Sequence, residues 1–150
     1  MGLRDLIDPS LINLELKATS RDEVLKELVS MLGLEEEPAA RLYKILWRQQ
    51  RLGSTGIGRG IAFVYFHTTP VSRLRVGYGR QPAGVDFRAI DDKPVYHFFL
   101  ILSPRIEDAN QFLPTLGKLA QFAKEPDVPD RLAQLKTAEA FLDLLDEKGL

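Results

Sequence analysis

The sequence predicts an α/β fold, because apolar strand patterns and amphipathic helix patterns follow one another along the chain. Its 150 residues are 45% hydrophobic and 27% charged, a composition that suits one globular domain over residues 1–150 with a sizeable core. No cysteine is present, which excludes disulfides, thiolate metal ligands and cysteine catalysis. The formal net charge of -1 gives no electrostatic reason to expect binding to nucleic acid.

The N-terminal part is predicted to form a short strand and two helices. Alternating apolar and polar residues predict an edge strand over residues 11–16. Ser20 and Glu23 form a capping box, and apolar residues then recur at helical spacing until Gly33. A second helix is expected to begin at the acidic residues 35–37, whose charges suit a helix N-terminus, and to end near Arg51.

Three further segments predict the main strands. Residues 61–67 form a nearly continuous apolar strand, and residues 73–80 form a strand whose arginines are expected on a solvated sheet face. Residues 81–84 contain proline and glycine and are expected to form a turn. Residues 96–102 predict a buried strand, in which His97 is expected to be a hydrogen-bonded core or strand-face residue and not a ligand.

The C-terminal part is predicted to be helical. One helix is expected to begin at residues 107–110, where Pro114 is tolerated if it falls near the helix start. A short helix over residues 130–135 and a last helix with an apolar inner face around Phe141 complete the chain. We interpret these helices as structural.

Four glycines interrupt residues 53–60, directly before the strand that begins at residue 61. Glycine allows positive φ and lets backbone N–H groups approach an anion closely. A P-loop, however, needs Lys and then Ser or Thr after its last glycine, and a dinucleotide fingerprint follows a strand instead of preceding one. The pattern alone therefore favours a tight connection in which the glycines only allow the backbone to turn.

Residues 52–62, read as L-G-S-T-G-I-G-R-G-I-A, resemble the hallmark loop of type 2 enzyme IIA (EIIA) domains. These are the fructose, mannitol and nitrogen-regulatory class of the bacterial phosphotransferase system (PTS). The resemblance covers nearly the whole chain and implies a three-layer α/β/α fold with a central mixed sheet. In that family the loop is followed by Ile-Pro-His, and the histidine accepts a phosphoryl group from a phosphocarrier protein and passes it to a IIB partner. Here Tyr65 takes the place of that histidine, and a phenol is a poor phosphoryl carrier.

Two further positions depart from the family pattern. The arginine that helps the family to bind the phosphoryl group matches Gln49, and a neutral amide cannot supply its charge. Arg48 and Arg51 lie nearby, but adjacent helix positions face different directions. The family's second histidine matches Phe112, which cannot donate a hydrogen bond. The three losses together indicate a domain that has given up phosphotransfer and acts by binding, as a regulator of a transporter or another protein.

The predicted binding surface comprises Gln49, Arg51, Ser54, Thr55, Gly56, Tyr65 and Phe112. The resemblance implies a protein partner, either the phosphocarrier protein, a IIB domain, or a regulated transporter or enzyme. We expect no cofactor and no metal ion. Because the apolar stretches are short and the N-terminus lacks the apolar core of a signal peptide, we expect a cytoplasmic protein without membrane insertion.

Two alternatives remain open. In the first, the domain is an active phosphocarrier that accepts a phosphoryl group on His67, with Arg48 or Arg51 as the clamp, and passes it to a IIB partner. This alternative requires two extra residues inside a strand, whereas length variation normally falls in loops. In the second, the domain is a small-anion sensor in which Ser54, Thr55 and the glycine N–H groups bind phosphate or a metabolite without covalent chemistry.

Overall fold

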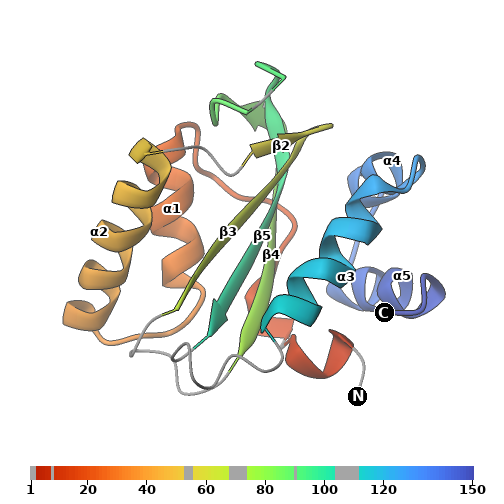
Figure 1. Ribbon diagram of the computed structural model, residues 1–150, viewed down its shortest axis with the longest axis horizontal. Coiled ribbons are helices and arrows are strands. Elements are labelled where there is room, and N and C mark those ends of the chain that lie inside the picture. Colours follow the sequence, from red (N-terminus) through yellow and green to blue (C-terminus); the bar gives the residue numbers. More distant parts are fainter. Residues whose placement is uncertain (1–2, 8, 53–55, 68–73, 90, 104–111) are drawn as a thin grey trace.

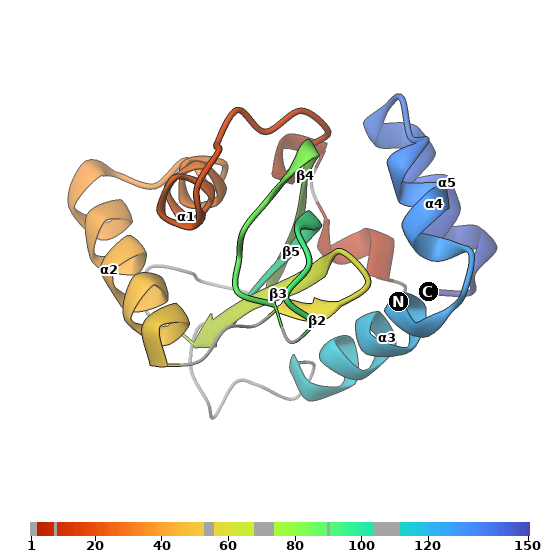
Figure 2. The same cartoon turned by 90° about the horizontal axis from the view of Figure 1, so that it is seen from above.

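The computed structural model of the chain describes residues 3–7, 9–52, 56–67, 74–89, 91–103 and 112–150. A β-sheet separates two groups of helices, which gives three layers (Figure 1). One face of the sheet is covered by α1 (Arg21–Ser30) and α2 (Glu36–Leu52), as Figure 2 also shows. The other face is covered by α3 (Phe112–Lys124), α4 (Val128–Ala133) and α5 (Ala138–Glu147). The three-layer α/β/α architecture predicted from the sequence is confirmed.

The strands of the sheet have the order β1-β4-β5-β3-β2. They are β1 (Ile12–Asn13), β2 (Gly56–Gly58), β3 (Ile61–His67), β4 (Arg75–Val85) and β5 (Val95–Ser103), and the 3₁₀ turns η1 (Leu3–Leu6) and η2 (Pro9–Leu11) precede them. β3 is parallel to β5, whereas β4 is antiparallel to β5, so the sheet is mixed. β2 pairs with the first residues of β3. Tyr65 pairs with Ile101 and His67 with Ser103, which places the ends of β3 and β5 side by side.

Residues of β3 alternate between two apolar cores, because successive side chains of a strand point to opposite faces. Ala62 and Val64 belong to the core that also contains the buried residues of α1 and α2. Ile61 and Phe63 belong to the core formed with α3, α4 and α5. The odd-numbered positions of β3 therefore face the C-terminal helices.

Local sequence explains where the helices begin. Ser20 caps α1, since its Oγ accepts a hydrogen bond from the Glu23 N–H at 3.3 Å and donates one to the Glu23 carboxylate at 3.1 Å. The first bond is the Ser20 half of the predicted capping box; in the second, the Glu23 carboxylate accepts from the Ser20 hydroxyl, whereas the motif uses the Ser20 backbone N–H. Pro114 is the third residue of α3, where its missing N–H is not needed by the helix. No helix within the described ranges combines the length and the apolar character needed to cross a bilayer.

Two strand predictions are wrong in their bounds. The strand predicted over residues 11–16 shrinks to Ile12–Asn13, because a 3₁₀ turn occupies residues 9–11. The turn predicted at residues 81–84 does not exist, because these residues continue β4 across an irregular register between Arg80 and Val85. The predicted start of the C-terminal helices at residues 107–110 lies outside the described residues.

The prediction that the arginines of β4 lie on a solvated face is wrong for Arg80. Only 9% of Arg80 is exposed. Its guanidinium donates hydrogen bonds to backbone carbonyls just after β1 and at the end of α4, namely those of Leu14, Leu132, Ala133 and Leu135. A buried charge is tolerated here because carbonyl oxygens replace the water that it loses.

Candidate binding site at the end of strand β3

Tyr65 lies in the second half of β3, beyond the residues that pair with β2. Its side chain is 37% exposed, although the strand before it is buried. The alternation of β3 places Tyr65 on the same sheet face as Phe63, which is the face covered by the C-terminal helices. A buried strand therefore presents a large aromatic residue to solvent.

Gln49 connects α2 to the same part of β3. Its Nε2 donates a hydrogen bond to the backbone carbonyl of Tyr65 at 2.9 Å. Its Oε1 is buried and has no hydrogen-bond partner among the described residues. A buried acceptor that is left unpaired costs about 1–3 kcal/mol, so this end of β3 holds an unused polar atom. The structure thus brings together two of the residues that the sequence predicted for the binding surface.

Ser103 is a polar residue of this region that the sequence did not reveal. It is the last residue of β5, it pairs with His67, and only 1% of it is exposed. Its Oγ finds no hydrogen-bond partner in the part of the chain that the structure describes. A hydroxyl at the end of an otherwise apolar strand was the only available signal, and it does not distinguish a site from a strand end.

For the remaining predicted residues, the structure describes the backbone alone or does not describe the residue. Arg51 belongs to the last turn of α2, Gly56 pairs with Ala62, and Phe112 is the first residue of α3. The side chains of Arg51, His67 and Phe112 lie outside the described part of the structure, as do Ser54 and Thr55 entirely. Neither the His67 alternative nor the anion site at Ser54 and Thr55 is therefore tested by the geometry.

The end of the glycine segment has a clear geometric role. Arg59 and Gly60 form the turn between β2 and β3, with φ values of 60° and 79°. Positive φ at both central residues is typical of the type I′ turn, whose twist suits a two-residue hairpin. The Gly60 carbonyl accepts hydrogen bonds from the N–H groups of Tyr96 at 2.8 Å and His97 at 2.9 Å. This turn therefore fixes the start of β3 against the start of β5.

The site offers hydrogen-bonding groups and an aromatic surface. Arg48, a possible clamp in the His67 alternative, is exposed on α2. Among the residues that the structure describes, no three His, Cys, Asp or Glu side chains lie close enough to hold a metal ion. The described side chains at the end of β3 can thus contact a partner through Tyr65.

A mixed sheet between two helical layers, with a glycine hairpin that leads into the strand of the site, defines an enzyme IIA-like fold. The chain belongs to the family described as phosphoenolpyruvate-dependent sugar phosphotransferase system, EIIA 2, whose sequence model matches residues 5–148. It is 26% identical over 146 residues to a nitrogen regulatory protein of Bradyrhizobium diazoefficiens, with 97% of this chain and 95% of that protein covered.

Two solved structures illustrate the likeness. The crystal structure of nitrogen regulatory protein IIA-Ntr from Neisseria meningitidis has a TM-score of 0.85 at 27% identity, and 95% of this chain and 98% of that chain are covered. Enzyme IIA of the Escherichia coli mannitol system, solved in complex with phosphorylated enzyme IIB, has a TM-score of 0.73 at 21% identity. That alignment covers 95% of this chain and 99% of the other, and it concerns the fold alone.

Proposed function

We propose that this chain is an EIIA-type domain that does not carry a phosphoryl group and instead binds a protein partner through the surface around Tyr65. The observation that carries the proposal is the environment of Gln49. At the position that matches the family's cationic clamp, a neutral amide donates to the Tyr65 carbonyl at 2.9 Å. A phosphoryl group needs cationic donors, and this side chain is neutral and already engaged with the strand.

Tyr65 is suited to be the anchor of an interface. Tyrosine is enriched in protein interfaces because it buries a large ring at a small cost in side-chain entropy and keeps a polar end. Its 37% exposure leaves ring surface for a partner to cover. Because β3 is held by Gln49 on one side and by β5 on the other, the anchor is preorganised, which lowers the entropic cost of binding.

The first partner class to test is a IIB domain. The mannitol enzyme IIA, which has the same fold, is known in a complex with its enzyme IIB. The relatives named as nitrogen regulatory proteins support a second class, a regulated transporter or enzyme. Either class places the domain in the cytoplasm, where the phosphotransfer proteins act.

The absence of phosphotransfer is tested by incubating the purified chain with phosphoenolpyruvate, enzyme I and the phosphocarrier protein. Intact-mass measurement then looks for an acid-labile phosphoryl group, with an active EIIA domain as the control for a competent donor. We expect no label on the wild-type chain. A label that disappears in His67→Ala would refute the proposal and establish a phosphocarrier with a displaced histidine.

The binding half of the proposal is tested with purified IIB domains by isothermal titration calorimetry. Tyr65→Ala is expected to weaken binding by about tenfold or more, as truncation of an anchoring tyrosine does. Tyr96→Ala is the matched control, because Tyr96 is also 37% exposed but lies five strand positions back along the sheet. Equal losses for the two variants would contradict a role for the surface around Tyr65.

A further inference from the structure

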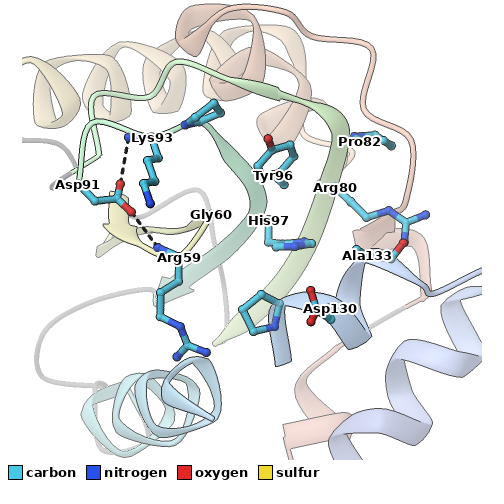
Figure 3. A pocket seen from close by; sticks show the side chains of 12 residues that line it. Arg59, Gly60, Arg80, Pro82, Asp91, Lys93, Tyr96, His97, Asp130 and Ala133 are labelled. Atoms are coloured by element: carbon cyan, nitrogen blue, oxygen red, sulfur yellow. Dashed lines mark hydrogen bonds between the residues drawn. The ribbon is translucent and has the colours of Figure 1, made fainter. Parts of the chain in front are cut away.

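A cavity of about 760 Å³ lies at the other end of β3, next to the β2–β3 turn (Figure 3). Its walls come from that turn, from β4, from the segment that leads into β5, and from α4. Cavities that hold small molecules usually measure roughly 300–1,000 Å³. The volume therefore suits a small organic ligand.

One wall of the cavity is the ring of Tyr96, which packs closely against two glycines. A Cβ atom at Gly60 would lie 3.1 Å from Cδ2 of the ring, and a Cβ atom at Gly84 would lie 2.8 Å from Cε1. Both glycines have positive φ, so only glycine fills these positions without strain. The wall is thus preformed, and the ring keeps 37% of its surface exposed.

Two charged side chains near the turn are fully used by the fold. The carboxylate of Asp91 accepts hydrogen bonds from the N–H groups of Arg59 and Lys93, both at 3.1 Å (Figure 3). The guanidinium of Arg59 donates to the carbonyls of Ala123 and Glu125 at the end of α3. A cation at a helix C-terminus is stabilised by the helix dipole, so these two residues serve structure.

The innermost part of the cavity has an uncompensated positive charge. Arg80 is bound by carbonyl oxygens, and none of the described carboxylates forms an ion pair with it. Its charge acts on His97, which is 3% exposed and whose pKa is lowered to about 4, first by burial and then by Arg80. Burial raises the pKa of the Tyr78 hydroxyl, which lies 2.8 Å from His97 Nδ1 and donates to the neutral imidazole.

Lys93 supplies a second cation beside the cavity, and its charge also helps to lower the pKa of the neighbouring Asp91 carboxylate. Its side chain is exposed and extends beside the cavity between Asp91 and Arg59 (Figure 3). No ion pair of its ammonium occurs within the described ranges. Three cationic side chains and two acidic ones, the second being Asp130 on α4, line the cavity, which leaves one positive charge in excess.

We propose that this cavity binds a small organic acid, whose carboxylate or phosphate is held by Lys93 and whose flat apolar body packs on Tyr96. Arg80 adds attraction at longer range, because its charge is buried in a region of low dielectric constant. Pro82 and Pro94 complete the apolar lining. The cavity shares no residue with the surface around Tyr65, so this proposal stands or falls independently of the proposed function.

The test is a titration of the ¹⁵N-labelled chain, followed by NMR, with benzoate, with phenyl phosphate, and with benzamide as the neutral isostere of benzoate. We expect saturable shifts of the Gly60, Tyr96 and His97 amides with at least one of the acids. That acid should bind about tenfold more tightly than benzamide, since one charge interaction at a partly exposed site has that magnitude. A bound anion should also raise the pKa of His97, because it offsets the charge of Arg80.

Matched variants separate the cavity from general attraction to lysine. Lys93→Met should lower the affinity for the acid about tenfold, whereas Lys44→Met, a change at an exposed position of α2, should leave it unchanged. The relative affinities of benzoate and phenyl phosphate tell which acid group the cavity prefers. The proposal is overturned if neither acid gives saturable shifts, if benzamide binds as well as the acids, or if Lys93→Met has no effect.

Discussion

Acid should destabilise this protein through His97, and replacing His97 by glutamine should remove the effect. In the folded chain the imidazole is buried and its Nδ1 lies 2.8 Å from the Tyr78 hydroxyl. To become charged, it must be protonated in a buried place beside the positive charge of Arg80. Glutamine can accept the Tyr78 hydrogen bond through its amide oxygen and does not titrate.

The size of this destabilisation follows from the change in the pKa of His97 on folding. Folding lowers the pKa of His97 from its ordinary 6.5 to about 4. Between these values the unfolded chain binds a proton that the folded chain does not, so stability falls as the pH falls. One pKa unit corresponds to about 1.4 kcal/mol, so the loss between pH 6.5 and pH 4 is about 3 kcal/mol. Above pH 7 the imidazole is neutral in both states and contributes no pH dependence.

The assay is urea unfolding of the wild-type chain and of His97→Gln at several pH values from 7.5 to 4. We expect the difference between their free energies of unfolding to be constant near neutral pH and to shift by about 3 kcal/mol in favour of the variant at pH 4. Carboxylates whose pKa is lowered by folding, such as Asp91 and Glu147, are present in both proteins and cancel in the difference. Parallel stability curves for the two proteins would refute the reasoning.

Three further changes test the packing, the capping and the buried charge. Gly79→Ala should lower the free energy of unfolding by about 1–3 kcal/mol in urea, because its Cβ would lie 2.9 Å from Leu16 Cδ1, and an unchanged value would show that β4 can move away. Its control, Gly117→Ala in α3, has no atom within 4 Å of the new Cβ and should instead stabilise the chain by up to about 1 kcal/mol; a loss would contradict open space there. Ser20→Ala should cost about 1 kcal/mol and lower the melting temperature, and an unchanged melt would mean that the capping box contributes nothing. Arg80→Gln should cost about 2–4 kcal/mol and raise the pKa of His97 in an NMR titration, and an unchanged pKa would exclude the field of Arg80 as a cause.

Local signals were sufficient for much of the fold. The strand predicted over residues 61–67 has the same bounds in the structure, because an apolar run that directly follows a glycine turn is a strong local signal for a buried strand. The turn prediction at residues 81–84 was wrong. Although these residues contain proline and glycine, β4 continues past them, because Val85 still pairs with Val95. The position of Arg80 was predicted wrongly for a related reason. Three of the carbonyls that accept its hydrogen bonds lie 52 to 55 residues further along the chain and the fourth, that of Leu14, lies 66 residues before it, so no local pattern reveals them.

The candidate sites depend more strongly on tertiary structure. The resemblance pointed to Gln49 and Tyr65, and the structure places them in contact. It did not reveal that the contact uses the backbone carbonyl of Tyr65, because a family pattern carries side-chain identities and no strand geometry. The cavity beside Lys93 could not be predicted at all, since its walls come from segments that no motif connects.

The position of β3 has a consequence for how such a domain changes over time. The strand begins at the cavity and carries Tyr65 near its other end, and its first four residues, Ile61 to Val64, are buried between these two sites. The two sites therefore have separate linings, and a side chain can change at one of them without being replaced at the other. A lineage can lose a chemical activity at one end and gain a ligand at the other without passing through an unfolded intermediate, and an engineer can vary the two ends in separate libraries.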